Sequence, residues 1–353
     1  MRILFYSHDR GGANLLIRVA QELVKKGETC LYLGHGPSAH VWTDSDVEGL
    51  HLSEHLLERN VRAHIRKFRP NLVVTGTSIF SYGEQQIWRI SRSLGIPSLA
   101  LVDGWSKIRD RFQSRNSRLV VPDRFGVVDT YTKRLLARTC NVSPSRIGVV
   151  GHPHLEEFSV KLIGARSMRS QSKILTIGFF STPIVNAEAD PGIRVAQSLL
   201  ESLPPHQPLK MLIKPHPREE THPWQQWSHE AQSDRKFENI QICLASEQST
   251  FDILAHVDVV VGLPTSVLIE AALSGIPTIA IEPRWWPTKN IAIARFLSEN
   301  VLRDASEIPQ EFFDILNKEI RHLPETGVRL FKNSRYRAIK MIRSSTRSAL
   351  NSN

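Results

Sequence analysis

A short basic loop between two prolines is the segment of this sequence best suited to chemistry. It comprises Lys214-Pro215-His216-Pro217 and follows an apolar run that is typical of a buried strand. Ligands of open α/β sheets bind beyond the carboxyl ends of strands, where this loop is expected to lie. Lysine offers a point charge and histidine offers N–H donors, and both suit a phosphate. We therefore predict phosphate binding here; the alternative is a stiff loop in which His216 only caps backbone groups.

A second anion site is predicted within residues 257–277. There a buried strand passes through a short loop into a helix capped by Thr265 or Ser266. Hydroxyl groups and free backbone N–H groups at a helix N-terminus bind anions. Glu270 falls one turn into this helix, where its carboxylate could accept hydrogen bonds from a ribose diol. The alternative role of Glu270 is to complement the helix dipole, which is worth about 0.5 kcal/mol.

The first half of the chain offers a glycine turn and an acid at a strand end. Gly11 and Gly12 stand between an apolar run and an amphipathic one, where the missing side chains let a ligand approach the backbone closely. Asp103 directly follows the apolar run 98–102. An acid in that position can take a proton from an acceptor hydroxyl. The alternative is that Asp103 and Gly104 only form a turn.

The elements that must position these residues alternate between short apolar runs and longer amphipathic ones. A helix with an inner apolar stripe is predicted after the glycine turn, and another over residues 53–68 with Ser53 as its cap. Strands are predicted at residues 3–6, 29–33, 72–75, 98–102, 125–128, 147–150, 174–180, 209–213, 240–244, 257–261 and 278–281. Such alternation predicts α/β architecture, with parallel sheets covered by helices on both faces.

The alternation restarts after a polar stretch at residues 159–173, which lacks strong periodicity and is predicted to be a linker with a hinge near residue 165. We therefore expect two α/β domains, at residues 1–165 and 166–325. The remaining segment, 326–353, contains no acid and interleaves Lys and Arg with apolar residues. It is predicted to be a terminal helix packed on the body with its basic face in water. The alternative is contact between that face and an anionic membrane surface.

Composition narrows the class of protein. A hydrophobic content of 41% with 23% charged residues argues against a disordered chain. Lys and Arg number 45 against 35 Asp and Glu, a net charge of +10 that suits anionic partners without choosing among them. Outside the tail the basic residues are interleaved with acids, so nucleic acid is not expected as a partner.

The cysteines and the apolar runs indicate the cellular compartment in which the protein is expected. The 3 cysteines lie far apart without zinc-ligand spacing, which predicts neither a disulfide framework nor a metal site. No apolar run approaches the ~18 residues of a membrane-spanning helix. We expect a cytoplasmic protein, with peripheral contact at the inner face of the membrane as the further alternative.

These motifs resemble the GT-B superfamily, in which two Rossmann-like domains face each other across a cleft. Bacterial sialyltransferase-like and capsule polysaccharide glycosyltransferases in that superfamily combine an acidic-Gly motif, a His-Pro motif and a Ser-Ser/Thr motif. Similar pairs here are Asp103-Gly104, His216-Pro217 and Thr265-Ser266. The non-hydrolysing UDP-N-acetylglucosamine 2-epimerases are more distantly similar.

The sequence departs from these groups at three places. Val102 stands where the glycosyltransferases often have a second acid, and Thr265-Ser266 reverses the usual order of the hydroxyl pair. Residues 216–220 do not match the His-Arg-Arg-Glu-Asn-like stretch of the epimerases. The resemblance therefore favours transfer over epimerisation.

The resemblance implies a glycosyltransferase that moves a sugar from a nucleotide-sugar to a glycan or lipid-linked acceptor in cell-surface polysaccharide synthesis. Asp103 would be the base and His216 the second catalytic residue, with neither a metal nor a cofactor besides the donor. The implied donor-binding residues are Lys214, His216, Pro217, Thr265, Ser266 and Glu270, and the implied acceptor-binding residues are Gly11, Gly12, Asn14 and Trp105. The alternatives are a sugar-nucleotide epimerase and a non-catalytic nucleotide- or glycan-binding protein.

Overall fold

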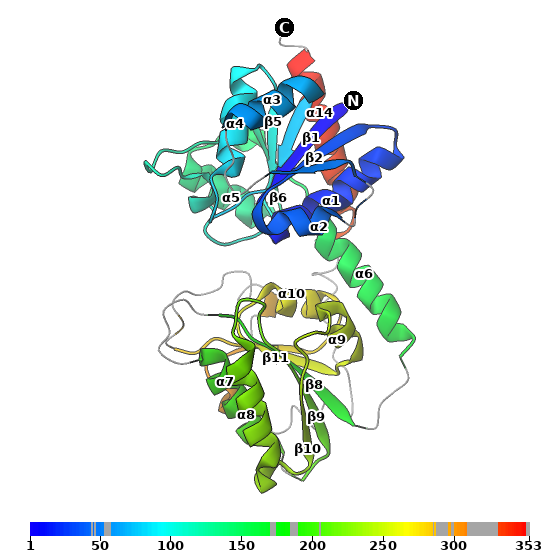
Figure 1. Ribbon diagram of the computed structural model, residues 1–353, viewed down its shortest axis with the longest axis vertical. Helices are drawn as coiled ribbons and strands as arrows, with labels where there is room; N and C mark the ends of the chain where they lie inside the picture. The colour runs from blue at the N-terminus through cyan, green and yellow to red at the C-terminus, as the bar shows by residue number, and fades with distance from the viewer. Residues whose placement is uncertain are drawn as a thin grey trace. The chain divides into compact units, whose positions relative to one another are not determined.

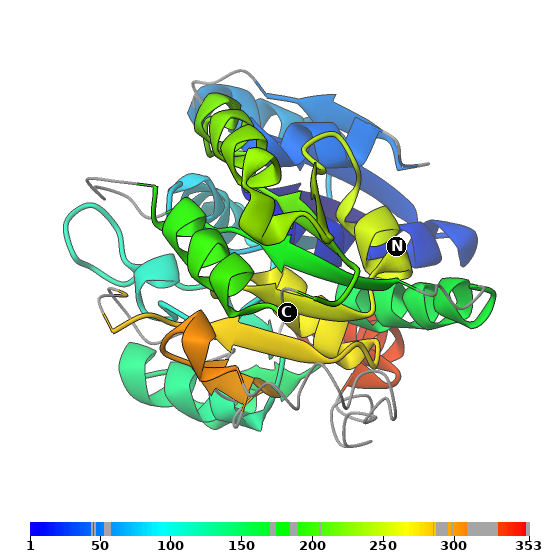
Figure 2. The same ribbon diagram turned by 90° about the horizontal axis from the view of Figure 1, so that it is seen from below.

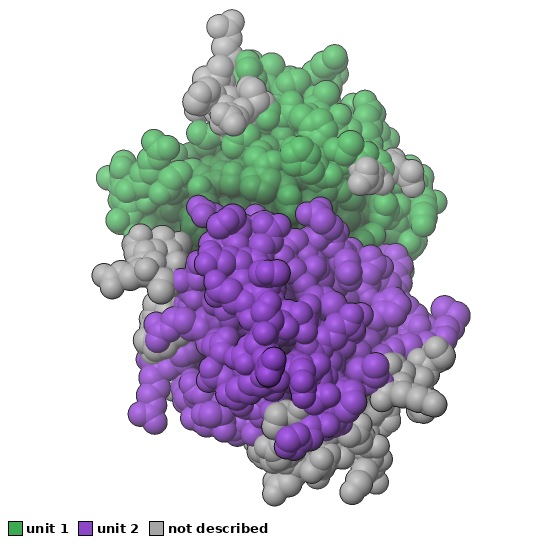
Figure 3. Space-filling view, turned by 60° about the horizontal axis from the view of Figure 1, so that its bottom comes forward, with its two compact units in different colours: residues 1–156, 329–353 green, residues 157–328 purple. Residues whose placement is uncertain are grey.

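The structure is a computed structural model that describes residues 1–43, 45, 47–52, 58–169, 174–183, 190–204, 206–284, 286, 296–297, 300–308 and 331–350. The chain divides into two units, coloured separately in Figure 3. Unit 1 comprises residues 1–156 and 329–353, and unit 2 comprises residues 157–328. Unit 1 is therefore assembled from both ends of the chain.

Unit 1 is built on a parallel sheet of seven strands in the order β3-β2-β1-β4-β5-β6-β7. The strands are β1 (Arg2–Ser7), β2 (Thr29–Gly34), β3 (Gly49–His51), β4 (Leu72–Thr75), β5 (Ser98–Leu101), β6 (Arg124–Val127) and β7 (Ile147–Val149). The helices of this unit are α1 (Arg10–Lys25), α2 (Ala39–Thr43), α3 (Glu58–Phe68), α4 (Gly83–Ser93), α5 (Thr130–Cys140) and α14 (Ser334–Leu350), with the short turn η2 (Asp110–Phe112).

Helices cover both faces of the unit 1 sheet. Leu16 of α1 and Ile342 of α14 share a buried cluster with Phe5 of β1, and Figure 1 shows the red α14 next to this sheet. Val61 of α3 and Ile87 of α4 belong to the cluster on the other face. Burying both faces explains why these strands read as continuous apolar runs.

Unit 2 is built on a parallel sheet of six strands in the order β10-β9-β8-β11-β12-β13. The strands are β8 (Leu175–Phe180), β9 (Leu209–Lys214), β10 (Ile240–Leu244), β11 (Val259–Gly262), β12 (Thr278–Ile281) and β13 (Val301–Leu302). The helices are α7 (Pro191–Ser202), α8 (Thr221–Ser233), α9 (Thr250–His256) and α10 (Ser266–Leu273). Figures 1 and 2 show α7 and α8 on the same side of this sheet, where Leu199 and Trp224 pack against Phe179.

Both sheets are doubly wound, and each reverses its strand order at one point. In unit 1 the reversal lies between β1 and β4, and in unit 2 between β8 and β11. Ligands of such sheets bind beyond the carboxyl ends of the strands at the reversal. The residues that follow these four strands are therefore the places to look for a site.

The predicted strands are confirmed with small shifts, and three predictions fail or miss. Residues 159–167 of the predicted linker belong to helix α6 (Pro153–Ser167), a helix that was not predicted; the division between the two units, after Glu156, also falls within α6. Its apolar residues lie all round the helix, with Leu162 buried and Val160 exposed, so no periodic stripe announced it. Val257 ends α9 instead of starting β11. Strands β3 and β13 were missed because they are short and not fully buried.

Some predictions fall outside the described residues. The proposed cap Ser53 lies there, and so do residues 326–330 of the basic tail. The described part of the tail forms α14, which packs on unit 1. Within the described ranges, no helix is both long enough and apolar enough to cross a lipid bilayer.

Candidate functional site

Strand register places the two predicted donor motifs of unit 2 at one sheet edge. Lys214 of β9 pairs with Phe180 of β8, and Phe180 pairs with Gly262 of β11. Lys214 and Gly262 are therefore two strand spacings apart, about 10 Å. A side chain on Gly262 would come 2.4 Å from the backbone oxygen of Phe180, so glycine is needed for this close approach. The sheet thus brings the two motifs together on either side of the end of β8.

Lys214 is anchored before any ligand binds. Its ammonium group donates hydrogen bonds to the backbone oxygens of Ser246 and Gln248, the latter at 2.7 Å. Burial lowers the pKa of Lys214, and the nearby Glu247 acts in the opposite direction. An ammonium group has three N–H donors, so one remains for an anion. The ammonium group of Lys214 is therefore held in a fixed position.

Glu219 organises the His216 loop, and the sequence analysis did not single it out. One carboxylate oxygen accepts the backbone N–H of His216 at 2.6 Å, and the other accepts the hydroxyl of Ser181 at 2.7 Å. Burial raises the pKa of Glu219. Nδ1 of His216 accepts the backbone N–H of Arg218 at 3.1 Å, so the neutral ring carries its proton on Nε2. The loop thus orients His216 as a hydrogen-bond donor, while Pro217 is exposed.

Four hydroxyl groups without a hydrogen-bond partner among the described residues follow strands of this same edge. Thr265 is the N-cap of α10, but its side chain makes no capping bond, and Ser266 is exposed at the first helical position. The hydroxyl oxygens of Thr182 and Ser246 are buried without a partner. Such groups can donate to oxyanions together with the backbone N–H groups of α10. Glu270, half-buried one turn in, already has an interaction partner.

In unit 1, Asp103 lies two residues beyond β5 and is held in an ion pair. Arg111 of η2 donates to Oδ1 of Asp103 at 2.6 Å and to the hydroxyl of Thr77, beyond β4, at 2.8 Å. A side chain on Gly11 would come 2.4 Å from Oδ2 of Asp103. Oδ2 therefore faces the N-terminus of α1, and the glycine predicted there is required by this approach.

Gly11 and Gly12 do not form the predicted turn before the helix, because α1 already begins at Arg10; in its first turn they serve packing as well as access. A side chain on Gly76 would come 3.1 Å from the Cα of Gly12, so the start of α1 and the loop after β4 touch through their backbones. Gly12 is buried, Gly11 is exposed and Asn14 is half-buried. Only Gly11 and Asn14 thus retain surface that an acceptor could touch.

His152 lies near the backbone of Asp103. Its Nδ1 accepts the backbone N–H of Leu155 at 3.2 Å. Burial lowers the pKa of His152 to about 3, so the ring is neutral at physiological pH. His152 was not predicted to be a site residue; its position shortly after the end of β7 is the sequence signal that could have indicated it.

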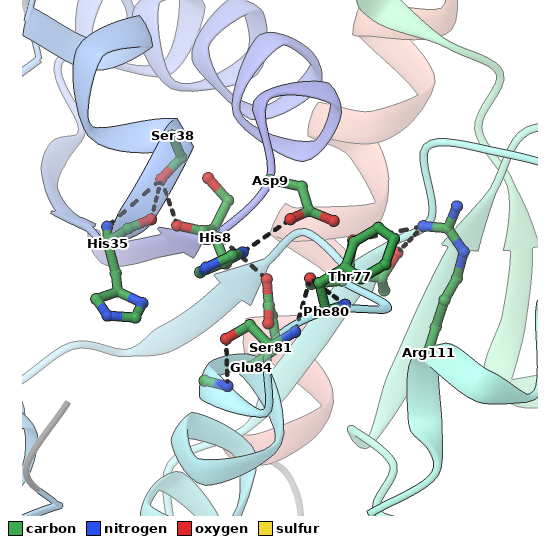
Figure 4. A network of polar contacts seen from close by, with 12 residues as sticks. His8, Asp9, His35, Ser38, Thr77, Phe80, Ser81, Glu84 and Arg111 are labelled. Carbon is green, nitrogen blue, oxygen red and sulfur yellow. Dashed lines mark hydrogen bonds and ion pairs between the residues drawn. The ribbon is translucent and has the colours of Figure 1, made fainter. Parts of the chain in front are cut away.

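A second polar cluster, shown in Figure 4, follows β1. Nδ1 of His8 lies 2.8 Å from Oδ1 of Asp9, and this hydrogen bond is the main reason that the pKa of His8 is raised. The backbone N–H of His8 donates to Oε1 of Glu84 at 3.1 Å. Burial raises the pKa of Glu84 to about 7, and its Oε2 has no partner among the described residues. The sequence analysis missed this cluster, although His8 and Asp9 directly precede the glycine turn.

Trp105 does not offer an acceptor surface. Its side chain is buried, and its indole N–H donates to Asp129 at 3.0 Å. Asp129 also caps α5 by accepting the backbone N–H of Thr132. Trp105 therefore fixes the loop after Asp103 to α5, and we do not retain it as an acceptor residue.

Several solved structures have a fold similar to that of this chain. Solved structures that superpose over nearly the whole chain include UDP-GlcNAc 2-epimerase from Methanocaldococcus jannaschii, with a TM-score of 0.70, 11% identity and coverage of 98% of this chain and 100% of that chain. MurG from Acinetobacter baumannii has a TM-score of 0.59 at 12% identity, covering 97% and 99%. The calicheamicin glycosyltransferase CalG4 has a TM-score of 0.59 at 13% identity, covering 98% and 98%.

The chain therefore has a GT-B fold. This confirms the resemblance drawn from the sequence at the level of fold. No protein-family model matches the sequence, and no curated protein matches it significantly.

Proposed function

We propose that this protein is a glycosyltransferase that uses a nucleotide-sugar donor and acts on a glycan or lipid-linked acceptor in cell-surface polysaccharide synthesis. The observation that carries the proposal is the edge of the unit 2 sheet. There Lys214, His216 and the unpartnered hydroxyls of Thr265 and Ser266 follow strands on either side of the strand-order reversal. Cations and hydroxyl donors on rigid loops at that place suit the phosphates of a nucleotide.

We propose a role in the reaction for residues of each unit. Asp103 takes the proton of the acceptor hydroxyl through Oδ2, because Oδ1 is held by Arg111. The acceptor oxygen bonds to the anomeric carbon as the bond from that carbon to the donor phosphate breaks. The charge left on the phosphate is met by His216, Lys214 and the start of α10. Glu270 binds the ribose.

Fixed donors at the leaving phosphate are the reason that the proposal includes no metal. They supply the positive charge and hydrogen bonds that a divalent cation would otherwise provide. Transfer should accordingly continue at an unchanged rate when EDTA is added. A loss of transfer that Mg²⁺ restores would contradict this part of the proposal.

Nucleotide binding is the direct test. We expect one of UDP, CMP, CDP and GDP to raise the melting temperature, because a ligand of the native state stabilises it by mass action. The double variant Thr265→Val/Ser266→Ala should bind that nucleotide at least about tenfold more weakly, because each hydrogen bond to a charged oxygen contributes about 1.5 kcal/mol or more. Its own melting temperature should be unchanged, since neither hydroxyl bonds within the described protein.

Ser249 provides a matched control. Its hydroxyl caps α9 by accepting the backbone N–H of Asp252 at 3.1 Å, so Ser249→Ala should cost about 1 kcal/mol of stability. It should not change nucleotide affinity. If no nucleotide in the panel binds, or if the double variant binds like the wild type, the proposed donor site is wrong.

Epimerisation is the second candidate, because UDP-GlcNAc 2-epimerase superposes with a TM-score of 0.70 against 0.59 for CalG4. Incubation with UDP-GlcNAc alone tests this candidate: an isomerised sugar favours an epimerase, and an intact donor argues against one. Nucleotide binding without turnover of any donor would favour a non-catalytic binding protein.

Membrane contact through α14 is a further part of the proposal. The apolar side of α14 is buried in unit 1, while Lys340 and Tyr336 are exposed. An outward basic face attracts anionic lipids without insertion. Sedimentation with phosphatidylserine vesicles, but not with phosphatidylcholine vesicles, is the expected result, and equal sedimentation would contradict it.

A further inference from the structure

A polar groove of about 310 Å³ opens on unit 1 beside the start of α4. The residues that line it are Tyr82, Gln85, Gln86, Arg89, Ser114, Arg115 and Asn116. None of the described residues that line it is acidic. Glu84, on the same helical turn, is buried and turns its carboxylate to the backbone of His8. The groove is therefore positively charged and rich in amide groups.

Both arginines of the groove are available to a ligand. In the part of the chain that the structure describes, neither Arg89 nor Arg115 forms an ion pair, and both are exposed. Arg115 lies over the ring of Tyr82, with its guanidinium carbon 5.3 Å from the ring centre. A cation held over an aromatic ring has fewer orientations to lose when it binds an anion.

The loop that carries Arg115 is held in place by hydrogen bonds. The backbone N–H of Ser117 donates to the oxygen of Ser114 at 2.9 Å, which closes a turn with Arg115 and Asn116 at its centre. The side-chain N–H of Gln85 donates to the backbone oxygen of Gln113 at 3.0 Å and ties α4 to this turn. The two arginines are therefore presented from elements that are hydrogen-bonded to each other.

Two amide oxygens here lack a donor. Oε1 of Gln85 and Oε1 of Gln86 are buried without a hydrogen-bond partner among the described residues, and the Gln85 side chain is only 3% exposed. An unsatisfied buried acceptor costs stability, which a ligand hydroxyl could relieve. Hydroxyl groups beside an anionic group, on a ring that can pack against Tyr82, describe a sugar.

We propose that this groove is a binding subsite for an anionic saccharide, a sugar chain whose rings carry carboxylate or phosphate groups. Arginine binds either group through two parallel hydrogen bonds, and the glutamine and asparagine amides bind ring hydroxyls. The inference deepens the proposed function, because it names the class of acceptor. The loop between β4 and α4 joins the groove to the base: Thr77 hydrogen-bonds Arg111, and Tyr82 lines the groove.

Three probes test the groove: an oligosaccharide of alternating glucuronate and N-acetylglucosamine, the same oligosaccharide with its carboxylates reduced to alcohols, and glucose 1-phosphate. Binding is measured by titration calorimetry or by NMR line broadening. We expect the acidic oligosaccharide or the sugar phosphate to bind, and the reduced oligosaccharide to bind at least about tenfold more weakly than the acidic one. Which of the two anions binds shows whether carboxylate or phosphate is recognised.

Matched charge variants locate the binding. Arg89→Gln/Arg115→Gln should lower affinity for the bound anionic probe to the level of the reduced oligosaccharide. Lys133→Gln/Arg134→Gln removes the same charge from α5 and should leave affinity unchanged. Lys133 is half-buried and the other three side chains are exposed. Circular dichroism checks that both double variants fold. Equal loss in the two double variants would mean general charge attraction and would overturn the proposal.

The remaining outcomes separate this inference from the proposed function. Absence of binding by every probe at millimolar concentration, while a nucleotide still binds unit 2, overturns the groove and leaves the transferase proposal standing. Binding of an anionic probe without any nucleotide binding supports the groove as a glycan site and overturns the transferase proposal.

Discussion

Asp103 is proposed to act as a base and is also held in a fixed position. Its carboxylate is assigned the role of base, and the ion pair with Arg111, whose partners are both largely buried, holds it in one orientation. The same pair occupies Oδ1, so only Oδ2, beside Gly11, can receive a proton. His152, which lies near the backbone of Asp103, is neutral and therefore adds no charge beside the carboxylate.

Replacing Asp103 by Asn should abolish transfer while leaving nucleotide affinity unchanged. The amide keeps the shape of the side chain but cannot take a proton at neutral pH, and the nucleotide is assigned to unit 2. The measurement is transfer rate together with the dissociation constant of the donor nucleotide. His8→Gln is the comparison: if it abolishes transfer and Asp103→Asn does not, His8 is the base. An equal fall in nucleotide affinity in Asp103→Asn would show that the assigned role is wrong.

Glu84 should make stability depend on pH. Burial raises its pKa from 4.5 to about 7, so the folded protein retains a proton that the unfolded chain releases as pH rises between these values. Stability is therefore lost through this window, by about 3 kcal/mol. In Glu84→Gln this loss should disappear, while the amide oxygen still accepts the His8 N–H.

Urea unfolding at pH 4.5 and pH 8 measures the difference. The free energy of unfolding of Glu84→Gln relative to the wild type should rise between the two pH values. Glu48→Gln, which changes an exposed carboxyl in the same unit, should show no such rise. Parallel pH profiles for wild type and Glu84→Gln would mean that Glu84 does not retain its proton.

At the scale of elements, α14 packs on unit 1 through its apolar residues. Ala338, Ile339, Met341 and Ile342 are buried in the same cluster as β1 and α1. Arg343 of the same helix pairs with Glu28 of unit 1 at 3.1 Å. The apolar stripe is thus used for packing, and only the basic face is left for a partner.

Ile342→Ala should therefore destabilise unit 1 by about 2–5 kcal/mol, since it leaves a cavity in a fully buried site. Lys340→Ala, on the exposed face of the same helix, should change stability by no more than about 0.5 kcal/mol. Chemical denaturation monitored by circular dichroism measures both. A similar small effect of both substitutions would mean that α14 contributes little to the core.

At the scale of the whole molecule, the division into two units makes their stabilities separable. Each unit has its own doubly wound sheet and its own buried clusters. The nucleotide is assigned to unit 2, and the last helix of the chain belongs to unit 1.

Calorimetry should accordingly show two thermal transitions. The nucleotide should raise one of them by mass action, and Ile342→Ala should lower the other. A single transition shifted by both changes would show that the units unfold together.

The sequence by itself determined the α/β class, most of the strands and the two donor motifs. Those inferences depend on local signals: apolar runs for buried strands, prolines and glycines for turns, and hydroxyl residues at a helix start. Thr265 was recognised as a cap because the backbone conformation there is set by neighbours in sequence. Gly11 and Gly12 were predicted to form a turn, but they lie in the first turn of helix α1. Helix α6 was missed because its apolar residues show no single face.

Only the tertiary structure decided what each polar group contacts. Arg111 contacts Asp103 within the same connection between β5 and β6 and also reaches Thr77 in the loop after β4, and Trp105 turns inward to Asp129. Strand order likewise brings Lys214 and Gly262 within two strand spacings, although 47 intervening residues separate them in sequence. Charge, burial and hydrogen bonding at a site depend on residues that are distant along the chain, so no local pattern encodes them.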